Sequence, residues 1–237
     1  ASAVLDSLLK CEMNCNQVIE SLKSLADPDY LAGMAHFAIH TDNALGVSAP
    51  RMRKLAKEIG TNHKLAIELW QSNIHEARIV AVLIDDPKQV TKSQMNNWVR
   101  QFDNWAVCDV CCCFLFDKTP FAWDKAIEWP ERKEEFVRRA GFALMAALAV
   151  HDKESPDKKF LPFFETIKQD AGDERNFVKK AVNWALRQIG KRNIVLNKKA
   201  LAVAKEIREI DSPAARWIAA DAIRELTNKK ILARLRT

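Results

Sequence analysis

The stretch FVRRAGFALMA, residues 136–146, decides the fold, because its design returns 41 residues later in FVKKAVNWALR, residues 177–187. In each stretch, an apolar pair and two basic residues precede an alanine-rich apolar run. EARIVAVLI (76–84) and AARWIAADAIR (214–224) are weaker versions of the same design. Self-similarity with a period near 40 residues is typical of HEAT-like arrays of paired helices. The sequence therefore predicts an all-α, HEAT-like helical repeat solenoid.

The rest of the chain also indicates helices that are joined by short turns. In NQVIESLKSLAD (16–27) the apolar residues recur with the spacing of one helix face. SAPRMRKLAKEIG (48–60) begins with a serine cap followed by proline, and it ends at a glycine. We predict a single repeat domain over residues 1–237, with an extra N-terminal helix within residues 1–14. Further helices are expected near 62–71, 74–84, 91–102, 104–116, 120–128, 131–150, 157–170, 174–190, 195–209, 212–225 and 228–235.

The net charge of +6 is distributed unevenly along the chain. Residues 1–130 contain 13 Lys and Arg against 16 Asp and Glu, whereas residues 131–237 contain 24 against 15. Basic residues at equivalent places in successive repeats would form a basic stripe along a concave groove. Such a stripe suits a long polyanion such as duplex DNA, although ordinary solvated helix faces would give the same count.

Several classes of protein are disfavoured by the sequence. It contains no apolar run of membrane-spanning length and no glycine-rich phosphate-binding motif. The six cysteines are clustered and do not have the spacing of a disulfide framework. The missing motifs argue against use of a nucleotide cofactor, and the cysteine spacing favours a reducing cytoplasm.

Four of the six cysteines lie in NWAVCDVCCCFLF, residues 104–116. Cys108 and Cys111 have C-x2-C spacing, but no second pair and no histidine pair stands nearby to complete a zinc site. On a helix, consecutive cysteines point in different directions and cannot meet one ion. Buried cysteine behaves as a small apolar residue, so core packing is the favoured interpretation and no metal site is predicted.

Trp105 and Asp109 in the same stretch are separated by four residues, so they share one face of a helix. An aspartate in an apolar helix is costly unless it has a partner or faces solvent. From the residues alone, an exposed aspartate, or a buried one that caps a neighbouring turn, remains the simpler interpretation.

The motifs NWAVCD (104–109), FVRRAGFALM (136–145) and AVNWALRQIGK (181–191) occur in the order and spacing of a known family. They resemble the HEAT-like repeat alkylpurine DNA glycosylases of the DNA alkylation repair enzyme family. ALGVSAPRMRKL (44–55) is similar to that family's N-terminal G-[IV]-x-x-P-x-x-R segment. The resemblance extends from about residue 16 to the C-terminus, and it implies base excision repair of alkylated double-stranded DNA. It also implies a monomer without a small-molecule cofactor, located in the bacterial cytosol and associated with the nucleoid when it acts.

By this resemblance, Asp109 matches the family's catalytic aspartate. Trp105 and Trp184 match the two tryptophans that flank the lesion-bearing nucleotide, and Arg139 matches an arginine that meets the DNA backbone. The family can have an aromatic residue immediately before the first tryptophan, where this chain has Asn104.

Three further residues are candidates for phosphate contacts. Arg187 lies three residues after Trp184 and therefore on the same helix face. Lys180 and Arg216 are suggested by their positions in the repeat. The other tryptophans lie in or beside apolar helical runs and are expected to pack in the core or at its edge: Trp70, Trp98, Trp123, Trp129 and Trp217.

The resemblance implies hydrolysis of the N-glycosidic bond of N3- or N7-alkylpurines. These bases are cationic and leave without protonation, so one carboxylate that stabilises the developing oxocarbenium ion and places a water is sufficient. An alternative is a non-catalytic HEAT-like module that binds branched or distorted DNA. A protein-binding scaffold is a third interpretation.

Overall fold

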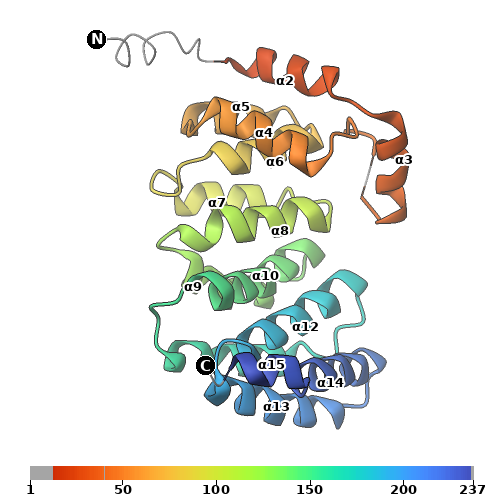
Figure 1. Ribbon diagram of the computed structural model, residues 1–237, viewed down its shortest axis with the longest axis vertical. Helices are drawn as coiled ribbons and strands as arrows, with labels where there is room; N and C mark the ends of the chain where they lie inside the picture. The colour runs from red at the N-terminus through yellow and green to blue at the C-terminus, as the bar shows by residue number, and fades with distance from the viewer. Residues whose placement is uncertain (1–12, 40, 236–237) are drawn as a thin grey trace. The chain divides into compact units, whose positions relative to one another are not determined.

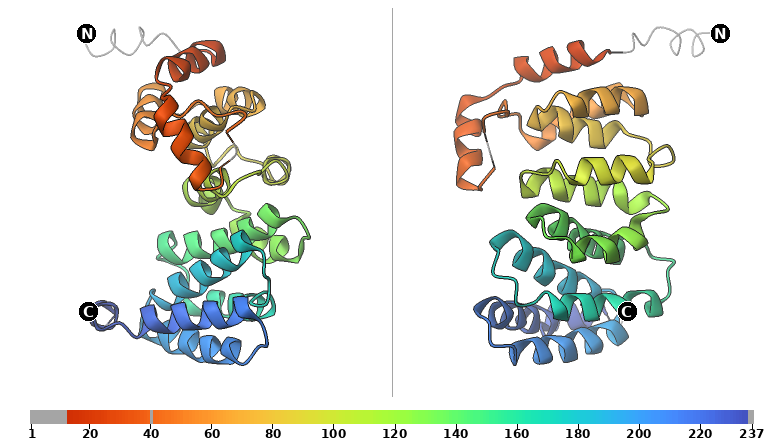
Figure 2. Two further views of the ribbon diagram at one scale, coloured as in Figure 1. Left: turned by 90° about the vertical axis from the view of Figure 1, so that its right-hand side faces the viewer. Right: turned by 180° about the vertical axis from the view of Figure 1, so that it is seen from behind.

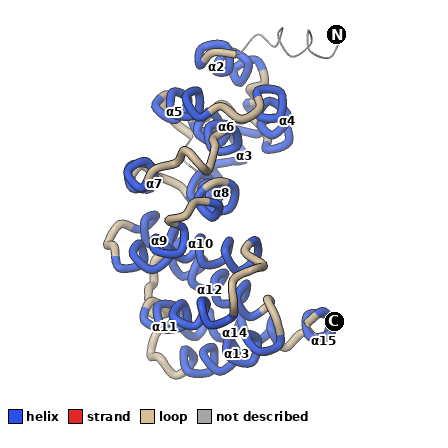
Figure 3. The backbone as a smooth tube through the Cα atoms, turned by 90° about the vertical axis from the view of Figure 1, so that its left-hand side faces the viewer, coloured by secondary structure: helices blue, strands red, loops and turns tan. Residues whose placement is uncertain are grey.

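A computed structural model describes residues 13–39 and 41–235 of the protein. Every regular element in those residues is helical, as the tube in Figure 3 shows, so the all-α prediction is confirmed. None of the described helices is both long enough and apolar enough to cross a membrane. The predicted extra N-terminal helix falls on residues 1–12, which lie outside the described residues, and Asn14 caps the first described helix.

The chain divides into two compact units between Gln89 and Val90. The single repeat domain over residues 1–237 therefore stays a prediction. The first unit contains the helices α2 (Cys15–Ser24), α3 (Pro28–His36), α4 (Ala49–Ile59), α5 (His63–Gln71) and α6 (His75–Ile84).

The loop before α4 is held by a buried carboxylate in the first unit. Glu76 is fully buried, and its side chain accepts hydrogen bonds from the backbone N–H groups of Leu45, Gly46 and Val47 at 2.8–3.2 Å. Gly46 has φ +78°, and a Cβ there would lie 2.3 Å from the carbonyl oxygen of Asp27. The glycine of the ALGVSAP segment is therefore required by backbone geometry and close packing.

In the described residues of the second unit, four helix pairs follow one another and precede α15, and short 3-10 turns (η) precede or follow some helices. Figure 1 shows how most of these helices are arranged. The elements of this unit are α7 (Lys92–Val99), α8 (Trp105–Phe114), η1 (Phe116–Lys118), α9 (Ala122–Glu128), η2 (Trp129–Glu131), α10 (Glu135–His151), η3 (Asp157–Phe160), α11 (Leu161–Gln169), α12 (Asn176–Gly190), α13 (Ile194–Arg208), α14 (Pro213–Leu226) and α15 (Lys229–Arg234). The helix predicted over 131–150 begins later, at Glu135, because Trp129–Glu131 form a separate turn.

The second helices of these pairs, α8, α10, α12 and α14, pack in that order, as the views in Figure 2 also show. The alanine-rich run of α10 is buried throughout from Arg139 to Ala149, because α8, α9 and α12 all pack on it. Small side chains allow this close approach. A Cβ on Gly141 would lie 2.3 Å from the ring of Pro130, so the glycine in FVRRAGFALM is needed where η2 crosses α10.

Candidate active site

The two faces of α8 have different compositions. Asn104 begins the helix by accepting hydrogen bonds from the N–H groups of Ala106 and Val107, which is the role of an N-cap. One face buries Val107 and three of the cysteines. The opposite face is partly exposed and contains Trp105, Asp109 and Cys113 at successive turns. The helix therefore presents Trp105 and Asp109 together, as their spacing predicts.

Cys108, Cys111 and Cys112 are fully buried, as the packing interpretation predicts, whereas Cys113 is partly exposed. The Sγ atoms of Cys108 and Cys112 lie 3.8 and 3.5 Å from carbonyl oxygens in α10. Burial raises the pKa of the Cys112 thiol well above its ordinary value, so this sulfur stays protonated and is a poor nucleophile. Among the described residues, no group of three or more His, Cys, Asp or Glu side chains is arranged to hold a metal ion.

Asp109 forms a bidentate ion pair with Arg139 of α10. The Nε and Nη2 atoms of Arg139 donate to the two carboxylate oxygens of Asp109 at 2.9 and 2.8 Å. The Nη1 atom of Arg139 donates to the carbonyl oxygen of Phe177, at the start of α12, at 2.6 Å. Arg139 therefore joins α8, α10 and α12 through one guanidinium group, and this geometry orients the carboxylate.

Solvent reaches Asp109 but hardly reaches its partner, because the two side chains are 21% and 7% exposed. Burial raises the pKa of Asp109 above its ordinary value, and the charge and hydrogen bonds of Arg139 act to lower it. Desolvation would lower the pKa of Arg139, but the neighbouring Asp109 raises it above its ordinary value. A bidentate guanidinium–carboxylate contact favours the ionised forms of both groups.

The two candidate tryptophans lie on different helices of the second unit. Trp105 is the first residue of α8, and Trp184 lies in the middle of α12, two turns after Phe177. Both indoles are partly exposed, in contrast to Trp70, Trp98 and Trp129, which are at most 4% exposed. Partial exposure leaves the two rings with area that a ligand can cover.

Arg187 is already paired within the protein. Its guanidinium contacts the carboxylates of Glu225 and Asp221 on α14, and Glu225 also accepts from Lys191 at 2.5 Å. Asn183 donates to Asp221 at 2.7 Å. Asn183–Asp221 and Arg187–Glu225 are both 38 residues apart, close to the repeat period. These partners could have been identified from the sequence by a search for carboxylates one repeat period after Asn183 and Arg187.

The remaining predicted phosphate contacts lie at the surface. Lys180 is exposed on α12. Arg216 is exposed on α14, where it pairs with the exposed Asp211 at 3.0 Å. The Nη1 atom of Arg138, next to Arg139, contacts Asp170 and Asp173 at 3.0 and 3.3 Å. Several cations of the predicted basic stripe are thus neutralised by local carboxylates.

Trp217 differs from the packing role that its sequence context predicts. Its side chain is 42% exposed, and the Nζ atom of Lys179 lies 5.9 Å from the centre of its ring. Position 217 is displaced by 38 residues from position 179, the same offset as the polar pairs between α12 and α14. The aromatic–cation contact therefore continues the row that joins these two helices.

Comparisons with known proteins assign the chain to a family. The family model for DNA alkylation repair enzymes matches residues 18–226, which is most of the chain. The chain belongs to the DNA alkylation repair enzyme family. It is also 24% identical over 161 residues to the uncharacterized protein Lin0241 of Listeria innocua, covering 68% of each chain.

Two solved structures have the same fold as this family member. One belongs to a new family of proteins related to the HEAT-like repeat DNA glycosylases with affinity for branched DNA structures. It is 23% identical with a TM-score of 0.75, and the match covers 90% of this chain and 95% of that one. The other, smu.31 from Streptococcus mutans, is 18% identical with a TM-score of 0.52, covering 88% and 96%. The family membership and the likeness to the first of these structures confirm the prediction of a HEAT-like repeat fold.

The residue roles within this family member stay predictions. The structure places Asp109 and Arg139 in direct contact, and it places Trp105 one turn from Asp109. A phosphate contact by Arg139 would require exchange of a bond that it makes within the protein, since its side chain is only 7% exposed. Arg187 and Arg216 likewise have carboxylate partners.

Proposed function

We propose that this protein is a DNA glycosylase that hydrolyses the N-glycosidic bond of cationic N3- or N7-alkylpurines in duplex DNA. The observation that supports it most is the Asp109 carboxylate, which is partly open to solvent and is held by Arg139 through two hydrogen bonds. This arrangement occurs in a chain of the DNA alkylation repair enzyme family. We expect it to act on DNA as a monomer without a metal ion or a cofactor.

The chemistry requires little more than a fixed negative charge. An alkylated purine is cationic, so the electron pair of the breaking C1′–N bond neutralises it and it leaves as a neutral base. The sugar becomes an oxocarbenium ion, which a preorganised carboxylate stabilises more strongly than it stabilises the neutral sugar. A water then forms the new C1′–O bond, and its proton passes to Asp109 and on to solvent.

Arg139 acts in this scheme as a positioning residue. It occupies one side of each Asp109 oxygen, and a carboxylate has about four lone-pair directions in all. The remaining directions are available to the sugar and to the water. Trp105 and Trp184 supply partly exposed aromatic faces, which attract a cationic nucleotide by roughly 0.5–2 kcal/mol each.

Single-turnover release of 7-methylguanine from methylated duplex DNA tests this function. Asp109→Asn keeps the shape and removes the charge, so we expect the rate to fall about 100-fold or more. Asp124→Asn makes the same chemical change at an exposed position on α9 and should leave the rate unchanged. Equal rates for wild type and Asp109→Asn would remove Asp109 from the mechanism.

A non-catalytic role in binding branched or distorted DNA is the second candidate. It is favoured by the likeness to the protein with affinity for branched DNA structures and by the closed Asp109–Arg139 pair. In that case, wild-type protein would bind a four-way junction more tightly than a linear duplex and would release no base. The release assay and a junction-binding titration therefore separate the two functions.

A further inference from the structure

A small pocket lies on the other side of α10 from Asp109. It is lined by Asn96, Val99 and Arg100 of α7, by Glu128, Trp129 and Arg132 around η2, and by Val137 of α10. Its cavity volume is about 30 Å³, and the pocket is open to solvent. Val137 and Arg139 are two residues apart, so they point to opposite sides of the helix. The pocket is therefore distinct from the candidate active site.

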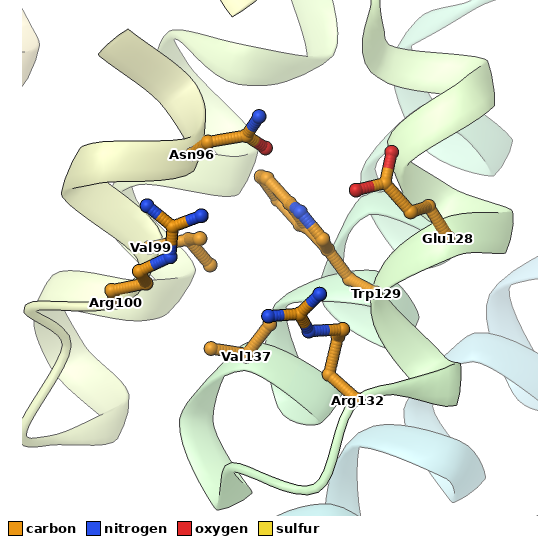
Figure 4. A pocket seen from close by; sticks show the side chains of 7 residues that line it. All are labelled: Asn96, Val99, Arg100, Glu128, Trp129, Arg132 and Val137. Atoms are coloured by element: carbon orange, nitrogen blue, oxygen red, sulfur yellow. The ribbon is translucent and has the colours of Figure 1, made fainter. Parts of the chain in front are cut away.

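The pocket has a buried apolar floor and a charged rim. Val99, Trp129 and Val137 are 2%, 2% and 4% exposed, so the floor belongs to the packed core. Arg100 and Arg132 are exposed and come from different elements. Figure 4 shows that both guanidinium groups point towards the space beside the Trp129 ring. Two cationic groups thus converge from different directions.

The one carboxylate in the pocket lining, Glu128, is neutralised by a buried lysine. Glu128 accepts a hydrogen bond from Nζ of Lys125 at 2.6 Å, and the Lys125 side chain is only 1% exposed. The same Nζ lies 5.9 Å from the centre of the Trp129 ring. A buried ammonium needs a fixed partner, so Glu128 is held by Lys125, and the charges of the two rim arginines remain in excess.

The rim arginines are much less engaged than Arg139. Within the described residues, the side chain of Arg100 makes one marginal hydrogen bond, to Asn97 Oδ1 at 3.5 Å. The guanidinium of Arg132 has one carboxylate neighbour, Glu134, at 3.7 Å. These distances exceed those of strong charge-assisted hydrogen bonds. Most of the ten N–H donors of the two groups are therefore available to a ligand.

Glu134 places one carboxylate of the chain near this rim, 3.7 Å from the guanidinium of Arg132. The pKa of Glu134 is lowered, first by a hydrogen bond from its own backbone N–H and also by the charges of Arg132 and Arg100. Both guanidinium groups therefore act on one carboxylate that comes from the chain itself. This carboxylate is an exposed competitor for any anion that enters the pocket.

We propose that this pocket is a phosphate-binding site, at which Arg100 and Arg132 hold one tetrahedral oxyanion against the edge of Trp129. A single guanidinium fork satisfies a planar carboxylate, whereas two forks from different elements match the several faces of a phosphate group. The phosphate comes either from solution or from DNA, as a strand end or a backbone group. The site is independent of the activity proposed for Asp109.

Titration with inorganic phosphate tests the site, with the indole N–H resonance of Trp129 as the probe. We assign this resonance by its loss in Trp129→Phe. We expect a saturable shift with phosphate and none with chloride at matched ionic strength. Arg100→Gln/Arg132→Gln should weaken binding at least about tenfold, because it removes the charged donors. Glu134→Gln should strengthen binding, because it removes the competing carboxylate.

Arg208→Gln is the matched control for loss of an arginine, because Arg208 is 57% exposed with a carboxylate neighbour at 3.7 Å. It should leave the shift unchanged. Oligonucleotides with and without a 5′-phosphate, and an unphosphorylated duplex, distinguish a strand end, a backbone group and free phosphate as the source. An absent shift, or an equal shift in the double variant, overturns the site whether or not the protein releases alkylated bases.

Discussion

On one side of the first turns of α10, Arg139 is locked between Asp109 and the backbone of α12, with three donor atoms used and 7% of its side chain exposed. On the other side, Arg100 and Arg132 surround an open pocket and have partners only at 3.5–3.7 Å. Arginine thus orients a carboxylate at the first place, whereas at the pocket its N–H donors remain available to a ligand. A count of basic residues does not distinguish these two states.

The difference follows from which helices meet. Asp109 lies on the partly exposed face of α8, directly opposite Arg139 of α10, so the charges pair as the helices pack. The pocket lies where α7, η2 and the start of α10 meet, and its own carboxylate is held by Lys125. Tertiary partners therefore decide whether an arginine has a structural role or is open to a ligand.

The largest effect that we expect is on stability, and it comes from removing the Arg139 guanidinium. Arg139→Gln leaves the desolvated Asp109 carboxylate without its ionic partner, so the free energy of unfolding should fall by about 3 kcal/mol. Urea unfolding monitored by tryptophan fluorescence measures this change. Arg216→Gln removes an exposed pair and should change it by less than about 0.5 kcal/mol. Similar losses in the two variants would contradict the locked state of Arg139.

The next effect separates a positioning role of Arg139 from a purely structural one. The guanidinium acts to lower the pKa of Asp109, so its loss raises that pKa. If base release requires ionised Asp109, the acid limb of the pH–rate profile should move to higher pH by about one unit or more in Arg139→Gln. Arg139→Lys keeps the charge and should give a smaller shift. An unchanged acid limb would leave Arg139 with a packing role only.

The smallest effect concerns the cations of α12. Lys180 is exposed, whereas Arg187 is neutralised by Glu225 and Asp221. Replacing a lysine that contacts one DNA phosphate reduces the slope of log affinity against log salt by about 0.9. We expect that reduction for Lys180→Gln and a smaller one for Arg187→Gln, measured by fluorescence anisotropy with duplex DNA over a salt series. Equal reductions would show that DNA displaces the carboxylates of α14.

Much of the secondary structure was predictable because its signals are local. Pro28 begins α3, and Gly60 ends α4, each by the backbone preference of that residue type. The pairing of Trp105 with Asp109 on one face follows from four-residue spacing alone. The separate turn at Trp129–Glu131 was missed, because it depends on Pro130 packing against Gly141 in the next helix.

The candidate site was predictable only in part. The repeat positions identified basic residues, and the resemblance to the family identified Asp109, Trp105, Trp184 and Arg139. Neither source indicated that Arg139 contacts Asp109, because the two residues are 30 positions apart and lie on different helices. The exposure of Trp217 was also missed, since an apolar run does not indicate which of its turns another helix will cover.

The sequence by itself determined an all-helical repeat chain, the placement of Trp105 and Asp109 on one face of α8, and the burial of Cys108, Cys111 and Cys112. Helical periodicity and residue size are properties of the chain that do not depend on tertiary contacts. Only the tertiary structure decided which charges are neutralised, because pairing and desolvation depend on groups brought together from distant positions. It orients Asp109 through Arg139 and leaves Arg100 and Arg132 open beside Trp129.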